Sequence, residues 1–137
     1  MFVVVDANRV FSALLTAGET FNVFLLNSLT RKIDFIAPEF LFVEIEKHID
    51  EIIERSNLSE GEITDIFGFI EEQITPVPFK QFTGHAEKAR QASPHDKDVP
   101  YFALALKTGA PIWSREKAFR GQSEVGIVSS SNLMEML

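Results

Sequence analysis

The sequence predicts an α/β fold in which a small central parallel sheet is flanked by helices. Short runs of β-branched and aromatic residues alternate along the chain with stretches whose apolar residues recur at helical spacing. This alternation favours parallel strands, because each parallel strand needs a long crossover, usually a helix, before the next one. The strand candidates number four or five and are short, so helices should make up most of the mass.

The first part of the chain predicts one strand and two helices. The β-branched run 2–5 predicts a buried strand that ends at Asp6. Apolar residues follow at helical spacing within 10–15, and we expect Gly18 to end that helix. A second helix should begin at Thr20.

The middle of the chain predicts a strand and two helices with recognisable starts. Residues 34–37 form the second strand candidate, and Pro38 suits the first turn of a long helix to about Arg55. The next helix has the clearest start in the sequence, because Ser59 and Glu62 have the spacing of a capping box.

The last part of the chain contains the remaining strand candidates. Two prolines in 74–78 suit an edge strand, because proline cannot donate to a central ladder. The other expected elements are a polar helix over 80–92, a helix over 98–107 and strands at 110–114 and 126–128, followed by a short final helix.

The composition is that of a globular protein and fits one domain over residues 1–137. Hydrophobic residues make up 45% of the chain and charged residues 24%. No run approaches the roughly 18 apolar residues that a membrane span needs, and the chain reaches Asp6 without the basic region of a signal peptide. The chain has no cysteine, which excludes disulfides, thiolate zinc sites and thiol nucleophiles. We therefore expect a cytoplasmic protein.

The charge is negative overall but unevenly distributed. The chain has 13 basic and 20 acidic residues, a net charge of −7. This balance argues against broad electrostatic binding to nucleic acid. Residues 107–120 differ, because they hold four bases and one acid. A divalent cation bound among acids would also offset part of the negative charge locally.

Two acids from distant parts of the chain are expected to meet Asp6. In a parallel α/β sheet, ligands gather at the carboxyl ends of the strands, which is where Asp6 is expected. The helix that begins at Asp98 runs about 15 Å away from its start, at about 1.5 Å per residue. The strand 111–114 then returns about 13 Å, at about 3.3 Å per residue. Asp98 and Glu116 should therefore lie at the same edge of the sheet as Asp6.

A fourth acid joins this group, and together they suit a divalent metal ion. Glu44 falls in the second turn of the helix after strand 34–37, close to the same edge. Clustered carboxylates raise one another's pKa values unless a cation lies between them. Ligands that are all oxygen suit Mg²⁺ or Mn²⁺. A metal ion held by few protein ligands and several waters is typical of enzymes that act on phosphate esters.

The order of these motifs resembles the PIN-domain ribonuclease family, which includes the VapC-type toxins of toxin–antitoxin pairs. The first match is a strand that ends in Asp6, with Asn8 two residues later, and the second is Glu44 within the helix after the second strand. The third runs from Asp98 to Phe119: a small-residue helix over 103–105, Gly109-Ala110-Pro111, a strand, and Ser114-Arg115-Glu116-Lys117.

This resemblance implies a metal-dependent endoribonuclease that leaves a 5′-phosphate and a 3′-hydroxyl. The family's four acids fall on Asp6, Glu44, Asp98 and Glu116, with Mg²⁺ or Mn²⁺ as the cofactor. The implied partners are the RNA substrate, an antitoxin protein and a second copy of the chain, with Phe21, Phe24 and Leu25 as a candidate dimer face. Two departures stand out, because Glu116 replaces the usual Asp and Ala118 stands where many relatives have another acid.

Six further residues are expected to support this site. Asn8 and Ser114 would orient the acids or a phosphate, although a turn asparagine and an ordinary strand-end serine fit these positions equally well. Arg9, Lys97, Arg115 and Lys117 would bind RNA phosphates, although a solvated basic fringe fits the same residues.

Other interpretations stay open for the acids and for the function. Asp6 fits a helix N-cap, and one of Asp96 and Asp98 fits another, while Glu44 and Glu116 fit ordinary exposed acids. A degenerate PIN domain that binds RNA or protein without cutting is the main alternative function. A phosphoacceptor domain that uses Asp6 is a weaker one.

Overall fold

The computed structural model describes residues 1–16 and 18–137 and contains one parallel sheet. The strand order is β3-β2-β1-β4-β5, and each neighbouring pair is parallel. The strands are β1 (Phe2–Val5), β2 (Asp34–Pro38), β3 (Ile74–Val77), β4 (Ile112–Trp113) and β5 (Ile127–Val128). The α/β class and the short parallel strands agree with the prediction from the sequence, and β3 lies at an edge as its prolines require.

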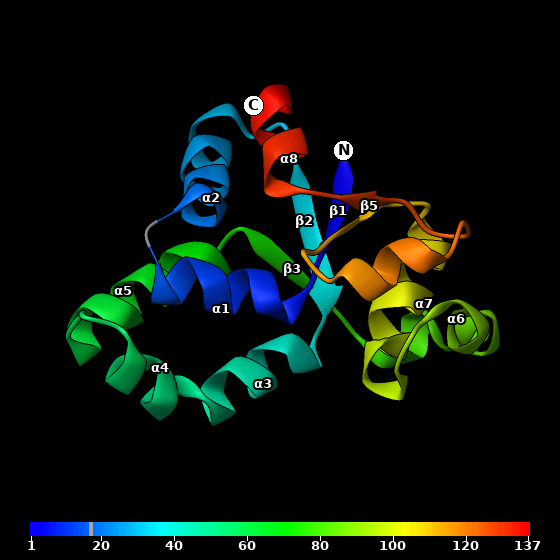
Figure 1. Cartoon of the computed structure of the whole chain (residues 1–137), viewed down its shortest axis with the longest axis horizontal. Helices are drawn as coiled ribbons and strands as arrows, with labels where there is room; N and C mark the ends of the chain where they lie inside the picture. The colour runs from blue at the N-terminus through cyan, green and yellow to red at the C-terminus, as the bar shows by residue number, and fades with distance from the viewer. Residues whose placement is uncertain (17) are drawn as a thin grey trace.

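Helices cover both faces of this sheet (Figure 1). They are α1 (Ala7–Leu15), α2 (Glu19–Thr30), α3 (Phe40–Lys47), α4 (Ile49–Arg55), α5 (Glu60–Glu71), α6 (Ala86–Ala92), α7 (Val99–Thr108) and α8 (Ser130–Met136). Short 3₁₀ turns are η1 (Phe79–Gln81), η2 (Thr83–His85), η3 (Asp96–Asp98) and η4 (Lys117–Gly121).

The sheet separates two hydrophobic cores, and its central strand β1 contributes side chains to both. Successive side chains of a strand point to opposite faces, so Val3 and Val5 join one core while Val4 joins the other. All three are fully buried. The first core holds an aromatic group in which Phe24 and Phe35 pack against Trp113 at ring-centroid distances of 5.1 and 5.5 Å. Such pairs stabilise a core by about 1 kcal/mol each beyond the area they bury.

The second core is built around α7. Its small residues Ala103 and Ala105 are buried and allow the helix to approach the sheet closely, and Phe102 packs edge-on against Phe119 at 5.0 Å. Gly109 ends the helix in the left-handed conformation, with φ of 72°, which glycine adopts without steric cost. The predicted helix and its stop are therefore confirmed.

The long helix expected from Pro38 to Arg55 is divided in the structure. Pro38 is the last residue of β2, and the backbone N–H of Glu39 donates to the carbonyl of Val77 on β3 at 3.1 Å. The chain then turns at His48, whose N–H donates to the Ile45 carbonyl at 3.1 Å, and α3 ends there and α4 begins. The expectation failed because the fixed φ of proline fits the end of a strand as well as the start of a helix.

Several helix boundaries also differ from those expected. The helix α1 ends at Leu15 rather than near Gly18, and α2 begins at Glu19. Residue 17 lies outside the described residues. The polar segment 80–92 contains parts of two 3₁₀ turns before α6, so it is not one helix. In the described part of the chain no single helix is long and apolar enough to cross a membrane, and only α1 and α2 taken together, bent by 101°, have the required length and composition.

Candidate active site

One cavity of about 260 Å³ brings together the four acids expected to form the site. Asp6 follows β1, Glu44 lies in α3, Asp98 precedes α7 and Glu116 follows β4. We call this the acid cavity. Its lining residues are Asp6, Ala7, Asn8, Phe11, Phe40, Glu44, His95, Lys97, Asp98, Tyr101, Glu116 and Phe119. Parallel strands bring these acids together because their carboxyl ends share one edge of the sheet.

Asp6 is buried and is held by Ser114 from the neighbouring strand end. Its residue is only 6% exposed, and its Oδ2 accepts a hydrogen bond from the Ser114 hydroxyl at 2.7 Å. Burial raises the pKa of Asp6, while this bond and the nearby charge of Arg9 lower it in part. Asp6 has the extended backbone of an N-cap, but its side chain makes no capping hydrogen bond. The N-cap interpretation therefore describes its backbone and not its carboxylate.

Asp98 shows the same combination of a helix start and a free carboxylate. It precedes α7, its side chain makes no capping hydrogen bond, and the residue is 8% exposed. Burial raises the pKa of Asp98, the negative charges of Asp6 and Glu116 raise it further, and Lys97 and His95 lower it in part. The acids thus influence one another through space, as expected for carboxylates around one cavity.

Glu44 and Glu116 are less enclosed than the two aspartates. Glu44 is half-buried and Glu116 is exposed, and both line the acid cavity. The backbone N–H of Glu116 donates to the Ser114 hydroxyl at 3.0 Å. Because that hydroxyl donates in turn to the Asp6 carboxylate, Ser114 connects Asp6 to the backbone of Glu116.

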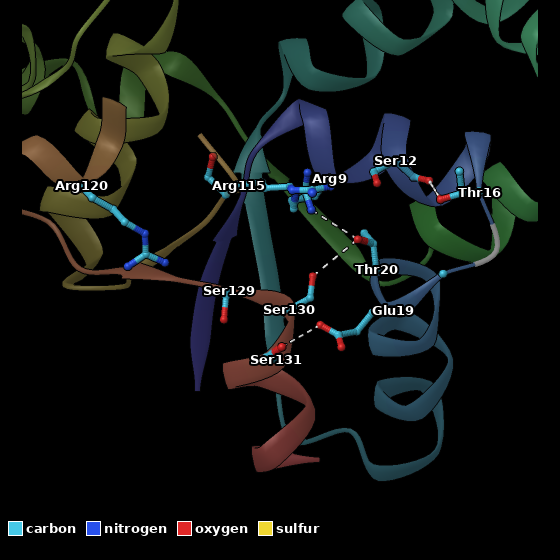
Figure 2. Close-up of a pocket in the computed structure, with 12 residues that line it drawn as sticks. Arg9, Ser12, Thr16, Glu19, Thr20, Arg115, Arg120, Ser129, Ser130 and Ser131 are labelled. Atoms are coloured by element: carbon cyan, nitrogen blue, oxygen red, sulfur yellow. Dashed lines mark hydrogen bonds between the residues drawn. The ribbon is translucent and has the colours of Figure 1, made fainter. Parts of the chain in front are cut away.

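A second and larger cavity of about 470 Å³ collects basic side chains (Figure 2). We call it the basic cavity. Its lining residues are Arg9, Ser12, Thr16, Gly18, Glu19, Thr20, Ser114, Arg115, Arg120, Ser129, Ser130 and Ser131. Of the bases expected to bind RNA, Arg9 and Arg115 line this cavity, whereas Lys97 lines the acid cavity. Lys117 is exposed and lines neither of the two.

Two polar residues that line the acid cavity, Tyr101 and His95, were not among the candidates from the sequence. Tyr101 is 3% exposed, and its hydroxyl has no hydrogen-bond partner among the described residues. Burial raises the pKa of Tyr101 well above its usual range, and the charges of Asp6, Glu44 and Asp98 raise it further. A signal did exist, because residues three apart on a helix share a face, and Tyr101 follows Asp98 by three. His95 also lines the cavity, whereas His48 is exposed and pairs with Glu51 at 3.4 Å.

The acid cavity is lined by oxygen ligands of the kind that a hard cation prefers. In the described residues, however, these ligands are not close enough together to form a complete metal site. In residues 1–16 and 18–137, no three Asp, Glu or His side chains approach closely enough to hold a metal ion as they stand. The donors facing the cavity are nevertheless carboxylates and the Asn8 amide, which suit Mg²⁺ or Mn²⁺. Two of the carboxylates are buried with raised pKa values, and the Tyr101 hydroxyl is unpartnered. These residues fit a cation that keeps several waters.

Comparison with known protein families identifies the fold. The family model for the PIN domain matches residues 4–131, which is nearly the whole chain. The chain belongs to the PIN domain family. This match confirms the resemblance inferred from the order of the acids and the small-residue helix. None of the curated protein sequences matches the chain closely enough to count as a relative.

Solved structures show that the same PIN fold recurs at very low sequence identity. The chain is similar to one in the crystal structure of VapBC2 from Rickettsia felis bound to a DNA fragment from their promoter. The TM-score is 0.68 at 9% identity, and the match covers 94% of this chain and 98% of the other. The likeness concerns the fold, since side chains differ at most positions of the PIN domain.

Proposed function

We propose that this PIN domain is a metal-dependent endoribonuclease whose catalytic residues are Asp6, Glu44, Asp98 and Glu116. The observation that carries the proposal is the meeting of these four acids, from four separate segments, around one cavity. Acids that served only as caps or as surface charges would have no reason to share a cavity. Their position at the carboxyl ends of the strands is where α/β proteins commonly bind ligands.

Mg²⁺ or Mn²⁺ is the proposed cofactor, held by Asp6 and Asp98 with help from Glu44 and Glu116. When bound, such an ion polarises a phosphate and lowers the pKa of a water ligand. Ser114 holds the Asp6 carboxylate in place through its hydroxyl, and Asn8 faces the same cavity. Lys97 lies beside the acids, where it would offset the charge of an incoming phosphate.

RNA is the proposed substrate, and its phosphates would contact the bases beside the acids. Arg9 and Arg115 line the basic cavity, which adjoins Asp6 through Ser114. Lys117 follows Glu116 directly and is exposed to solvent. These bases would draw the strand toward a molecule that is negatively charged overall.

A protein partner and a second copy of the chain complete the proposal. The similar VapBC2 structure was solved with promoter DNA, and we propose that this PIN domain is likewise the toxin of a cytoplasmic toxin–antitoxin pair. Phe24 is fully buried, so it does not belong to a dimer face, but Leu25 and Leu29 on α2 are 44% and 78% exposed. We propose pairing through this exposed side of α2. A chain that sediments as a monomer at every concentration would contradict pairing.

Cleavage of RNA by two matched variants tests the proposal. Single-stranded and structured RNAs are incubated with Mn²⁺ and with wild type, Asp98→Asn or Asp96→Asn. Asp96 is two residues away and exposed and does not line the acid cavity, so its variant carries the same charge change at a neutral position. We expect Asp98→Asn to lose at least about a hundredfold in rate, as loss of a main charge-stabilising group does, and Asp96→Asn to cut normally. Equal cleavage by all three would point to a contaminant or to another site.

A non-catalytic PIN domain that binds RNA or a protein remains the second candidate. Two observations favour it: the absence, in the described residues, of a ready metal cluster, and the replacements at Glu116 and Ala118. Calorimetric titration with Mn²⁺ separates the two functions. Binding that disappears in Asp98→Asn supports the nuclease, whereas no binding at millimolar metal supports the non-catalytic domain.

A further inference from the structure

The basic cavity has a lining suited to an anion. Three arginines, Arg9, Arg115 and Arg120, line it together with hydroxyl groups of α1, α2 and the segment that opens α8. Figure 2 shows Arg115 beside Arg9 and Arg120 extending toward Ser129. Among the described lining residues the one carboxylate is Glu19, and its Oε1 accepts a hydrogen bond from the Ser131 hydroxyl at 3.0 Å.

Arg9 is a buried cation whose side-chain hydrogen bonds go to neutral groups. Only 7% of the residue is exposed. Its Nε donates to Asn8 Oδ1 at 3.0 Å and its Nη1 donates to Thr20 Oγ1 at 3.3 Å. The ion pairs found in the described chain do not include Arg9, so no carboxylate oxygen lies within 4.0 Å of its guanidinium. Arginine is seldom fully buried without a paired charge, because desolvation of an ion is costly.

A second guanidinium makes this arrangement less favourable still. Burial lowers the pKa of Arg9, the charge of Asp6 raises it, and the positive charge of Arg115 lowers it. Neither Arg115 nor Arg120 takes part in an ion pair within the described part of the chain. Like charges directed at one cavity repel each other unless an anion lies between them. The planar fork of a guanidinium matches the oxygens of a phosphate.

The basic cavity is joined to the acid cavity at two points. Ser114 lines the basic cavity, and its hydroxyl donates to Asp6 Oδ2 at 2.7 Å. Asp6 and Arg9 lie three residues apart at the start of α1, and each lines one of the two cavities. A nucleic-acid strand carries one phosphate per nucleotide, so a strand that crosses the acids would bring a neighbouring phosphate toward the arginines.

We infer that the basic cavity is a phosphate-binding subsite for a nucleotide next to the bond that the acids would cut. That the bound strand is RNA rests on the proposed nuclease function. That the cavity binds a phosphate rests on its arginines and hydroxyl groups and does not depend on that function. Arg9 is the buried arginine of the subsite, and Arg115 and Arg120 are exposed arginines at its edge. Ser129 and Ser130 supply hydroxyl donors. The subsite would hold the strand in register while the acid cavity holds the reacting phosphate.

Binding of a short single-stranded RNA in EDTA tests the subsite separately from catalysis. The variants are Arg115→Gln, Arg120→Gln and their double variant, and Arg90→Gln is the control. Arg90 is an exposed arginine on α6 that lines neither cavity. We expect each single change to weaken binding about tenfold, the loss of one charge-assisted contact, and the double change to weaken it more. Arg90→Gln should bind as wild type does.

The form of the oligonucleotide identifies the source of the phosphate. The same RNA is titrated with a 5′-hydroxyl and with a 5′-phosphate end, in wild type and in the double variant. A preference for the 5′-phosphate that the double variant loses assigns the subsite to a terminal phosphate. Equal affinities that fall together in the double variant assign it to an internal phosphate of the strand, and both results support the inference.

Two outcomes would overturn the inference, and neither depends on RNA cleavage. The first is a double variant that binds RNA as tightly as Arg90→Gln does. The second is an acidic peptide such as oligoglutamate that competes with RNA at equal affinity and loses its affinity in the double variant, since the cavity would then recognise a protein segment. If wild type fails to cut RNA with Mn²⁺ but binding still follows the arginines, the proposed function fails and the subsite stands.

Discussion

Asp6 and Asp98 each occupy the N-cap position of a helix, yet neither side chain makes a capping hydrogen bond. Both are buried and both have pKa values raised by that burial. A group whose pKa is raised by folding stabilises the protein fully only while it is protonated. These carboxylates therefore cost stability at neutral pH, as groups kept for binding rather than for folding often do.

The pH dependence of stability tests whether the buried carboxylate of Asp98 costs stability at neutral pH. With a pKa raised above 3.8 in the folded chain, its favourable contribution is present below about pH 3.8 and is lost as the pH rises through the folded value. In EDTA we expect Asp98→Asn to melt a few degrees above wild type at pH 7, and the difference to shrink as the pH falls toward 4. The measurement is a series of thermal melts, with the exposed Asp96→Asn as the control. A neutral-pH gain of the same size in Asp96→Asn would contradict the assignment to burial.

Tyr101 packs its ring against Phe40 at a ring-centroid distance of 5.6 Å, but its buried hydroxyl has no hydrogen-bond partner among the described residues. A hydroxyl without a partner in the interior costs about 1–3 kcal/mol, which phenylalanine in the same position would avoid. Its place on the wall of the acid cavity, one helical turn after Asp98, gives the hydroxyl a use as a donor to a ligand. The cavity therefore contains, beside its carboxylates, a hydroxyl donor that has no acceptor among the described residues.

Among the secondary-structure elements, α2 is joined to the start of β2 by the side chain of Asn27. Asn27 is 4% exposed, its Oδ1 accepts from the Ile33 N–H at 2.9 Å, and its Nδ2 donates to the Ile33 carbonyl at 3.0 Å. The same Nδ2 lies 3.2 Å from Oε1 of Gln73, the residue that precedes β3. One amide thus satisfies the backbone where the chain enters β2 and also bonds to the segment between α5 and β3.

Replacing Asn27 with alanine should destabilise the fold without touching either cavity. The Ile33 backbone groups would be left buried and unpaired, which costs about 2–3 kcal/mol in the free energy of unfolding. Asn22→Ala is the matched control, because Asn22 is an exposed asparagine on the same helix. Chemical denaturation measures both variants. A loss in Asn27→Ala no larger than that in Asn22→Ala would show that the amide network contributes little.

At the scale of the whole molecule, the four acids line one cavity and three arginines line a neighbouring one. The chain carries a net charge of −7, but its acids around Asp98 and its arginines around Arg9 face different spaces. A net negative charge disfavours binding of nucleic acid by overall charge alone. Affinity for RNA should therefore come from few phosphate contacts.

The salt dependence of RNA binding measures how many phosphates are contacted. For single strands the slope of log affinity against log salt is about −0.7 for each phosphate neutralised. Three arginines at the basic cavity predict contact with one to three phosphates, so we expect a slope between about −0.7 and −2. Titrations in EDTA at several salt concentrations provide this slope. A value several times steeper would reveal a basic surface elsewhere on the molecule.

The sequence by itself determined the class of fold and the order of most elements, and it predicted that the four acids would lie close together. The β-branched run of β1, the Gly109 stop after α7 and the capping box at Ser59 are local signals, so these features were predictable. Boundaries such as that at Pro38 were not, because a proline fits two local structures and packing chose between them.

Only the tertiary structure decided which side chains share a space. Ser114 and Asp6 are 108 residues apart in the chain and 2.7 Å apart in the fold. The basic cavity is formed where α1, α2, β4 and α8 come together, and no pattern of neighbouring residues in the sequence predicts it. The buried, unpaired state of Arg9 and of the Tyr101 hydroxyl likewise follows from long-range packing, because burial is a property of the assembled core and not of the neighbouring residues.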